Sequence, residues 1–323
     1  MQANDSYPQP DSLTDARYPP AMPFAQARSI VAVIPAYNED RFIASVVLKT
    51  RQYVSTVIVV DDGSTDLTAS LAEAAGAIVV RHSSNQGKSA ALNTGLRHVT
   101  QMSADVIVLL DGDGQHHPQD IPAVLQPVVD QLADIVVGSR FMRLGNRIPR
   151  WRIFGQHALT SLTNALSGVP LTDSQSGFRA LSEAAIRQLR FSQGGFIVES
   201  EMQFLARELG LRMLEVPIGV TYAEAPKRNP VAQAMQIING LLRLFVQMRP
   251  LLFFGVPGAF LLMAGIIMGL GVVMLYDTSR QLAIGSALVT IMLVMVGTLS
   301  LFTGFILHSI RGLLIQWVDR LRA

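Results

Sequence analysis

The stretch VIVLLDGDGQ at residues 106–115 decides the fold class of this chain. Its first five residues are apolar on both faces, which is typical of a strand buried inside a parallel sheet. Two carboxylates and an amide follow at once. Parallel sheets bind their ligands at the carboxyl ends of their strands, so the sequence predicts an α/β domain with a polar crevice after Leu110.

Similar apolar runs alternate with helix-like segments around that strand. The predicted strands cover 30–35, 57–60, 77–80, 106–110 and 135–137, and the predicted helices cover 41–53, 66–75, 87–99 and 118–132. This alternation indicates a doubly wound, mostly parallel sheet with helices on both faces.

Two apolar runs without any charged residue occupy 251–276 and 282–307. A helix of that length rises about 39 Å, which exceeds a hydrocarbon core of about 30 Å. The connector 277–281 is short, so we expect a transmembrane hairpin. Basic residues lie mainly outside the connector, at Arg243, Arg249, Arg311, Arg320 and Arg322. By the positive-inside rule, we expect a multi-pass protein of the cell membrane with its folded domain and both termini in the cytoplasm.

Composition bounds the remaining segments and partners. Residues 1–27 contain five prolines between Pro8 and Pro23 and no apolar signal region, which predicts a disordered tail. Residues 309–323 are expected to form a basic tail. The chain has no cysteine, which excludes disulfides and thiolate metal sites. The formal net charge is only +2 without a Lys/Arg run, so nucleic acid is not an expected partner.

Two further segments have helical amphipathic spacing. In the first, about 150–167, apolar residues recur every three or four positions at Trp151, Phe154, Ala158, Leu162 and Ala165. In the second, 229–249, they recur at Met235, Ile238, Leu242 and Phe245. The first segment fits a membrane-interface helix and a core-facing helix equally well. The second leads directly into a span, which favours the interface.

Polar clusters follow three of the predicted strands. Asp111, Asp113 and Gln115 have the oxygen ligands that Mg²⁺ prefers, although an Asp-x-Asp turn alone is a weak signal. Asp61 and Asp62 follow the strand 57–60, where carboxylates can accept hydrogen bonds from a base or a ribose, or simply cap the next helix. Tyr37, Asn38 and Glu39 follow the first strand in the same way, and all three clusters are expected to meet in one crevice.

Six short motifs in this order resemble the family 2 inverting glycosyltransferases with a GT-A (Rossmann-like) fold. They are IPAYNE (34–39), VVDDGSTD (59–66), NQGKSAALNTG (85–95), LDGDGQHHP (110–118), VGSRF (137–141) and SQSGFRA (174–180). Within that family, the chain is similar to the dolichyl- or polyprenyl-phosphate sugar synthases, some of which carry two C-terminal spans. The resemblance implies a catalytic domain over 28–228, followed by an interface helix at 229–249 and two spans within 250–308.

The resemblance also implies roles for individual residues. The nucleotide-sugar would be bound by Pro35, Tyr37, Glu39, Asp61, Asp62, Lys88, Asp111, Ser176 and Gly177, with Phe178 beside the sugar. A Mg²⁺ or Mn²⁺ ion would be bound by Asp111, Asp113 and Gln115. Catalytic roles fall on Asp113, Arg140 and Arg179, and an acidic role on a following helix falls on Glu199 or Glu201.

The acceptor phosphate is expected at Arg140. Family members often have a second Arg in a Ser-Arg-Gly context, whereas this chain reads Phe154-Gly155-Gln156-His157 at that place. Arg150, Arg152, Lys227 and Arg228 are candidate substitutes, and each is explained equally well by attraction to anionic headgroups.

The function implied is inverting transfer of a sugar from GDP-mannose or a UDP-hexose onto a polyprenyl or dolichyl phosphate. A processive polysaccharide synthase would add a Gln-x-x-Arg-Trp motif, but Trp151 lies in Pro-Arg-Trp-Arg. An inactive scaffold would not need Asp111 and Asp113 beside Gln115, and a nucleotidyltransferase would need no spans. Glycines in the first span, at 258, 265, 269 and 271, leave room for packing against a second copy.

Overall fold

One mixed sheet forms the centre of the folded domain. The computed structural model describes residues 29–102, 104–143, 150–191, 198–221, 235, 238–240, 242–243, 245–247, 249–281 and 283–322, without the side chains of 150–152 and 314–322. The sheet order is β3-β2-β1-β4-β6-β5-β7. The strands are β1 Ile30–Ala36, β2 Thr56–Asp61, β3 Ile78–Arg81, β4 Val106–Leu109, β5 Ile135–Ser139, β6 Arg179–Ser182 and β7 Met213–Pro217.

The pairing is mostly parallel, as predicted. β1 pairs in parallel with β2 and β4, β2 with β3, and β5 with β7. The four-residue strand β6 is the exception, because it lies antiparallel between β4 and β5. The prediction contained neither β6 nor β7, and β6 is the strand that holds the end of the SQSGFR segment beside β4.

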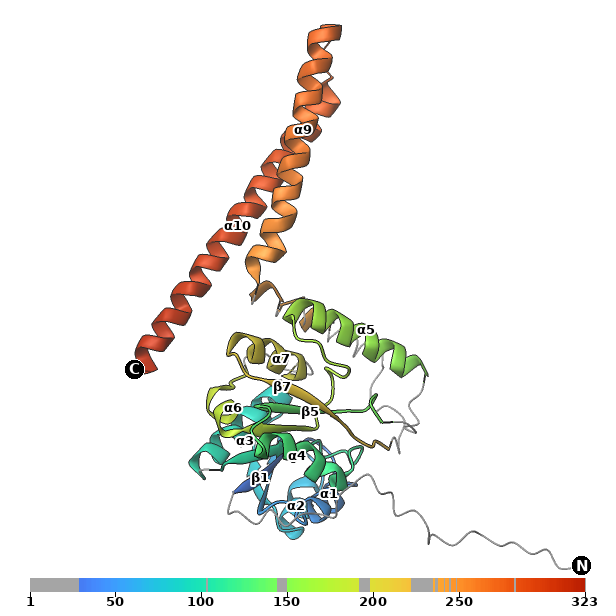
Figure 1. Cartoon of the computed structure of the whole chain (residues 1–323), viewed down its shortest axis with the longest axis vertical. Helices are drawn as coiled ribbons and strands as arrows, with labels where there is room; N and C mark the ends of the chain where they lie inside the picture. Colours follow the sequence, from blue (N-terminus) through green and yellow to red (C-terminus); the bar gives the residue numbers. More distant parts are fainter. Residues whose placement is uncertain are drawn as a thin grey trace, which may run out of the picture.

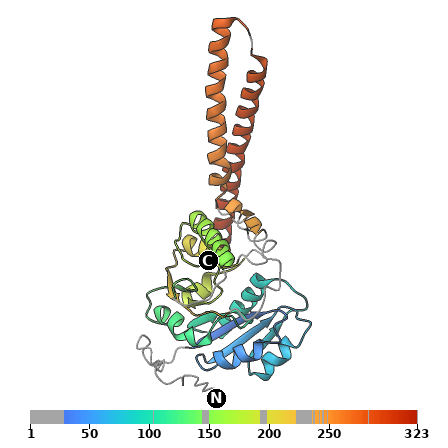
Figure 2. The ribbon, with the colours of Figure 1, turned by 90° about the vertical axis from the view of Figure 1, so that its right-hand side faces the viewer.

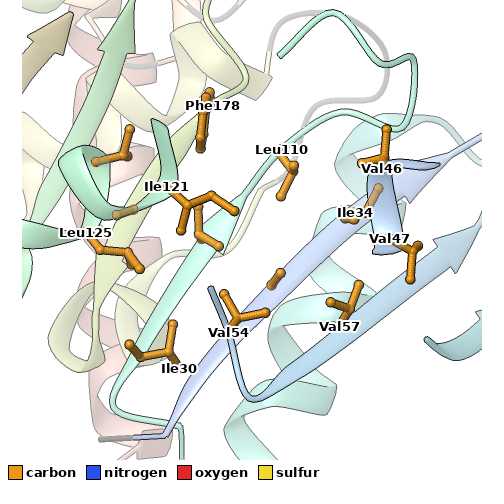
Figure 3. Close-up of a cluster of buried hydrophobic side chains, with 14 of the residues drawn as sticks. Ile30, Ile34, Val46, Val47, Val54, Val57, Leu110, Ile121, Leu125 and Phe178 are labelled. Atoms are coloured by element: carbon orange, nitrogen blue, oxygen red, sulfur yellow. The ribbon is translucent and has the colours of Figure 1, made fainter. Parts of the chain in front are cut away.

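Helices cover both faces of the sheet (Figure 1). They are α1 Ile43–Thr50, α2 Thr68–Ala74, α3 Lys88–Gln101, the 3₁₀ turn η1 Pro118–Asp120, α4 Ile121–Val129, α5 Arg150–Ser167, α6 Glu183–Gln188 and α7 Val198–Glu208. Alternate residues of β1 divide the core. Ile34 packs with α1 and α4, whereas Val33 packs with α3 and the α6–α7 side. Figure 3 shows the first of these clusters, in which Phe178 and Leu110 lie above Ile121.

One predicted helix ends earlier than expected. The expectation was a helix over 118–132, but α4 ends at Val129. Gln131 adopts a left-handed φ of 59°, and the backbone N–H of Leu132 bonds back to Pro127 O at 2.9 Å. A left-handed residue of this kind terminates a helix by capping its last carbonyls.

Two long helices project from the domain (Figure 2). The first begins with a π-helical turn, η2 Leu251–Gly255, and continues as α9 Val256–Ser279, and the second is α10 Ile284–Arg322. Both segments are long and apolar enough to cross a membrane, and only 11% of each apolar window is buried by the rest of the chain. That exposure distinguishes them from core helices. The expected basic tail over 309–323 is instead helical as far as Arg322.

Glycines bring α9 and α10 together. A Cβ on Gly258 would lie 2.8 Å from Leu301 N, and a Cβ on Gly297 would lie 2.5 Å from Leu262 N. Gly265 would likewise meet Val294, and Gly269 would meet Thr290. The small residues therefore serve contact within the hairpin, and of the four glycines predicted to face a second copy, only Gly271 has nothing within 4 Å of such a Cβ.

An ion pair ties the end of the hairpin to the domain. Arg311 of α10 donates to Glu208 at the end of α7. The second apolar helix is therefore in contact with the helix that carries Glu199 at its opposite end.

Candidate active site

The carboxyl ends of β1 and β2 lie side by side. Ala36 is in register with Asp61, and the N–H of Asp62 donates to Ala36 O at 2.9 Å. β4 pairs with the other edge of β1, so Asp111 follows a neighbouring strand. The three polar clusters singled out in the sequence therefore follow three adjacent strands.

A partly buried three-charge group forms the floor of this region. Lys88 Nζ, at the first residue of α3, lies 2.6 Å from Asp111 Oδ1 and 2.6 Å from Glu199 Oε1. Burial alone would lower the pKa of Lys88, but the two carboxylates raise it above its usual value, so the ammonium stays charged. Of the two acids that the sequence left open, Glu199 is the partner of Lys88. The group borders a cavity of about 10 Å³, enough for about one water molecule.

Gly177 closes on this group from the SQSGFR segment. A Cβ at this position would lie 2.6 Å from Asp111 Oδ2 and 3.0 Å from Lys88 Nζ. Only glycine leaves those two charged atoms in place. Its neighbour Ser176 has a buried hydroxyl without a hydrogen-bond partner in the described part of the chain.

Asp111 and Asp113 lie two residues apart but differ in electrostatic state. Burial raises the pKa of Asp111, but Lys88, together with His116 and Arg140, outweighs it and lowers the pKa of that carboxyl. Burial, followed by the charge of Asp111, raises the pKa of Asp113, and Glu39 adds to this shift. Asp113 accepts one hydrogen bond, from the backbone N–H of Gln115 at 3.0 Å. Asp113 is thus a carboxylate destabilised by its surroundings, and a bound cation would relieve that.

The donor set around Asp113 fits a hard divalent ion that also takes ligands from a substrate. Within the described residues, three or more His, Cys, Asp or Glu side chains do not gather into an all-protein metal cage. Two carboxylates with Gln115 alongside are instead the partial ligand set that Mg²⁺ uses together with phosphate oxygens and water. His116 Nδ1 is also buried nearby. It has no hydrogen-bond partner among the described residues.

Asp61 and Asp62 are adjacent in sequence but face different partners. Asp62 accepts from the N–H groups of Gln86 and Gly87 at 2.9 and 2.8 Å, and from His82 Nδ1 at 2.7 Å. It therefore holds the loop that starts α3, and its carboxylate is fully engaged. Asp61 is fully buried and accepts from Ser64 N at 3.0 Å, with Arg81 Nε 3.0 Å from its other oxygen.

An open hollow of about 450 Å³ lies beside Asp61. It is lined by residues 63–65 and 81–83. Tyr37, 39% exposed, follows β1 nearby. The sequence analysis missed Arg81 and His82. A charged residue at the end of a short predicted strand was the available signal for Arg81, since the neighbouring strands also end in charges.

Two arginines predicted to be catalytic form hydrogen bonds with other groups of the protein. Arg140 donates Nε and Nη2 to the buried Asp173, both at 2.7 Å. Arg179 is 1% exposed and donates to the carbonyls of Ser174, Ser176 and Glu199. The geometry gives Arg179 a supporting role under the SQSGFR segment rather than contact with a substrate. Each of its three nitrogens donates to a backbone carbonyl, which fixes the orientation of the guanidinium.

Helix α5 presents its apolar stripe outward and its polar side inward. Phe154 is 79% exposed, and Ala158, Leu162 and Ala165 are exposed along the same face. The buried side carries Thr160, which accepts from Ser174 N at 3.2 Å, and Ser167, which accepts from Gln203 at 3.1 Å. These hydrogen bonds attach α5 to the domain. The helix lies at the end of the domain from which the hairpin rises (Figures 1 and 2). This arrangement excludes the core-facing alternative for the first amphipathic segment.

Several residues predicted to bind the acceptor phosphate or the membrane lie outside the described residues. Lys227, Arg228, the side chains of Arg150 and Arg152, most of 229–249 and the tail 1–27 are among the residues without a described placement. Arg143, four residues beyond the end of β5, is described and was not predicted. Its Nη1 lies 3.2 Å from Asp120 Oδ1.

Comparison with known proteins identifies the scaffold. Residues 31–190 match the profile of Glycosyl transferase family 2. A UDP-N-acetylglucosamine–dolichyl-phosphate N-acetylglucosaminyltransferase of Methanococcus voltae is 34% identical over 220 residues, covering 60% of this chain and 86% of that protein. The chain belongs to glycosyl transferase family 2. The resemblance predicted from the six motifs is confirmed.

Other relatives of this glycosyltransferase extend the comparison. An uncharacterized protein of Methanocaldococcus jannaschii is 36% identical, covering 67% of this chain and 89% of that protein. An undecaprenyl-phosphate mannosyltransferase of Micrococcus luteus is 31% identical, covering 58% and 82%. Among solved structures, glucosyl-3-phosphoglycerate synthase of Mycobacterium tuberculosis, in complex with Mn²⁺, UDP and its product, aligns with a TM-score of 0.55 and 27% identity over 67% of this chain and 80% of that one. The GT-A-like fold is therefore confirmed.

Proposed function

We propose that this glycosyltransferase moves a sugar, with inversion, from a nucleoside-diphosphate sugar onto a polyprenyl or dolichyl phosphate at the cytoplasmic face of the membrane. One combination of features carries the proposal. The same chain has a carboxylate-rich site at adjacent strand ends and two exposed apolar helices that rise from that domain. Relatives named for dolichyl-phosphate and undecaprenyl-phosphate acceptors support the lipid phosphate.

The donor nucleotide is assigned to the strand ends of β1 and β2. The base would enter the hollow lined by Ser64 and Arg81, where the guanidinium offers donors and the buried Asp61 holds it in place. Tyr37 offers a partly exposed ring at the same edge. Asp62 shapes this pocket indirectly, by holding the loop before Lys88. The UDP complexes of the structural neighbour support this end of the assignment.

The diphosphate is assigned to the loop after β4. Asp113 and Gln115, with Asp111 behind them, would hold a Mg²⁺ or Mn²⁺ ion, which supplies charge neutralisation for the departing nucleoside diphosphate. Lys88 keeps Asp111 ionised and in place. The negative charge of Asp111 then raises the pKa of Asp113. Gly177 lets the SQSGFR segment pack closely against Asp111 and Lys88.

The acceptor chemistry does not require a dedicated base. A phosphate monoester has a second pKa of about 6, so its oxygen is already anionic at neutral pH and attacks the anomeric carbon directly. The protein must instead hold two anions close together, which needs cations on the acceptor side. The outward apolar face of α5 and the hairpin would keep the site at headgroup level, where a membrane-embedded phosphate can reach it.

The decisive test uses Asp113→Ala in the full-length protein in nanodiscs. A panel of labelled nucleotide-sugars is offered with one polyprenyl phosphate, and lipid-extractable label is scored. We expect one donor to be used by the wild type, at least a 10³-fold loss in Asp113→Ala with unchanged membrane insertion, and loss in the wild type with excess EDTA. Full activity of Asp113→Ala, or of the wild type in EDTA, would remove the metal role.

The same panel separates the alternative functions. A lipid-linked polymer in place of a single transferred sugar would identify a processive synthase. Absence of nucleotide-sugar binding would identify an inactive scaffold. Since the structural neighbour is a glucosyl-3-phosphoglycerate synthase, phosphoglyceric acid is included as a soluble acceptor, and transfer to it alone would contradict the lipid acceptor.

A further inference from the structure

The cations at the described floor of the site are already neutralised. Lys88 bridges Asp111 and Glu199, and Arg140 is bound at two points by Asp173. Asp173 is fully buried, and Arg140 outweighs that burial to lower the pKa of its carboxyl, so the pair is ionised. These side chains stabilise the site, but they bring little uncompensated positive charge to a second anion.

Arg143 differs from them in how it is held. A single nitrogen, Nη1, contacts Asp120, at 3.2 Å from one oxygen and 3.4 Å from the other. Asp120 already accepts a shorter bond, 2.7 Å, from the N–H of Gly219. The Arg143 side chain is 37% exposed, so this ion pair is weak and solvent-screened. Asp120 tethers the guanidinium without saturating its remaining donors.

The tether places Arg143 beside the proposed metal loop. A Cβ on Gly219 would lie 2.9 Å from Arg143 Nη1 and 2.6 Å from His117 Nδ1, so both side chains pack directly against the backbone of Gly219. Two residues on, the N–H of Thr221 donates to Gln115 O at 3.0 Å, and Thr221 Oγ1 lies 2.8 Å from His117 Nε2. Segment 219–221 therefore lies against the loop that begins at Asp111, and Arg143 lies at their junction.

We propose that Arg143 binds the phosphate monoester of the acceptor, through guanidinium donors that Asp120 does not occupy. The inference rests on the proposed function and adds a residue to it. A guanidinium offers several N–H donors in one plane and matches phosphate oxygens better than an ammonium does. This position of the guanidinium needs glycine at position 219, because a side chain there would push Arg143 away.

Two variants test the site in different ways. Arg143→Gln removes the charge, whereas Gly219→Ala keeps the charge and displaces the guanidinium. Gly219 has no left-handed φ, and the atoms that its Cβ would meet are ends of flexible side chains, so this variant should fold. Arg143→Lys keeps the positive charge but removes the planar set of guanidinium donors. Arg212→Gln is the matched control. Arg212 pairs with Asp134 at the amino ends of β5 and β7, whereas Arg143 follows the carboxyl end of β5.

Binding is measured by calorimetry on the full-length protein with farnesyl phosphate, with farnesol as the uncharged probe. We expect at least a tenfold weaker Kd for farnesyl phosphate in Arg143→Gln and Gly219→Ala, an intermediate Kd in Arg143→Lys, and the wild-type Kd in Arg212→Gln. In turnover, the KM for polyprenyl phosphate should rise by a similar factor, while nucleoside-diphosphate binding changes less than twofold. An unchanged Kd in Arg143→Gln overturns the inference.

Further arms identify the source of the phosphate. If Arg143→Gln alters only the dependence on phosphatidylglycerol in the nanodisc, Arg143 binds bulk headgroups and the inference fails. If glycerol 3-phosphate binds as tightly as farnesyl phosphate and loses affinity in the same variants, the site is supported but the lipid acceptor is not. If the wild type transfers no sugar to any polyprenyl phosphate, the proposed function fails, while the Kd series still decides whether Arg143 binds a phosphate monoester.

Discussion

Two carboxylates in one motif do different work because of a single lysine. Lys88 pairs with Asp111, which leaves Asp111 ionised and fixed, whereas Asp113 keeps one hydrogen bond and a raised pKa. The motif alone makes the two residues look equivalent. The difference depends on Lys88, which precedes Asp111 by 23 residues in the chain and approaches it only because α3 begins at the carboxyl edge of the sheet.

Replacing Gly177 by alanine should disturb this centre without removing any charged group. The added Cβ would lie 2.6 Å from Asp111 Oδ2 and 3.0 Å from Lys88 Nζ, and both side chains are held in place by the ion pairs of Lys88 with Asp111 and Glu199. We expect kcat/KM to fall by about 10²-fold or more, which corresponds to about 2.7 kcal/mol. Steady-state kinetics with saturating lipid acceptor measures this loss.

Gly155→Ala is the control for that substitution. Gly155 lies within α5, where a Cβ would meet nothing within 4 Å. Alanine should therefore preserve activity and stabilise the helix by about 0.5–1 kcal/mol. Equal activities in the two variants would mean that the close approach at Gly177 has no role in catalysis.

At the scale of single elements, α5 is the helix whose sequence was hardest to interpret. Its spacing correctly predicts a helix with one apolar stripe, and α5 covers the predicted range 150–167. Periodicity cannot tell whether that stripe faces a core or a lipid surface. The answer lies in Thr160, Thr163 and Ser167, which are buried against the domain. Threonine and serine on the opposite side of an apolar stripe were the available signal.

A fluorescent label at Phe154 should report lipid contact. Since the chain has no cysteine, Phe154→Cys carries a single environment-sensitive dye. We expect a blue-shifted emission in nanodiscs that lipid-attached quenchers reduce. Leu132→Cys is the control, because Leu132 is also exposed but precedes β5 at the opposite end of the strand. Equal quenching at the two positions would contradict a membrane-facing α5.

The hairpin should depend on glycine in the same measurable way. Gly297→Leu would place a side chain 2.5 Å from Leu262 N and 2.9 Å from Gly258 O, so α9 and α10 must separate. We expect a lower Tm in detergent, by several degrees or more. Gly271→Leu adds the same side chain where nothing lies within 4 Å, and it should leave Tm nearly unchanged. If Gly271→Leu instead alters oligomeric size, that glycine faces a second copy.

At the scale of the whole molecule, local patterns predicted strands β1 to β5 and missed β6 and β7. β1 and β4 are apolar runs, which can be predicted from composition alone. β6 is four residues long and includes Arg179, whose burial depends on carbonyls of Ser174, Ser176 and Glu199. The Arg140–Asp173 pair likewise joins residues that only the fold brings together. Sequence motifs identified which residues matter, but not which of them bind substrate and which hold the site.

The membrane arrangement makes the last prediction. α9 and α10 form an antiparallel pair whose connector lies at the far end from the domain (Figure 2), so the connector and the domain should be on opposite sides of the bilayer. In whole cells, Arg280→Cys should react with a membrane-impermeant maleimide, whereas Leu132→Cys should react only after permeabilisation. Protection at position 280 together with labelling at 132 would invert the orientation. Labelling of both in intact cells would mean that the hairpin does not span the membrane, and the site would then lie outside the compartment that supplies nucleotide-sugars.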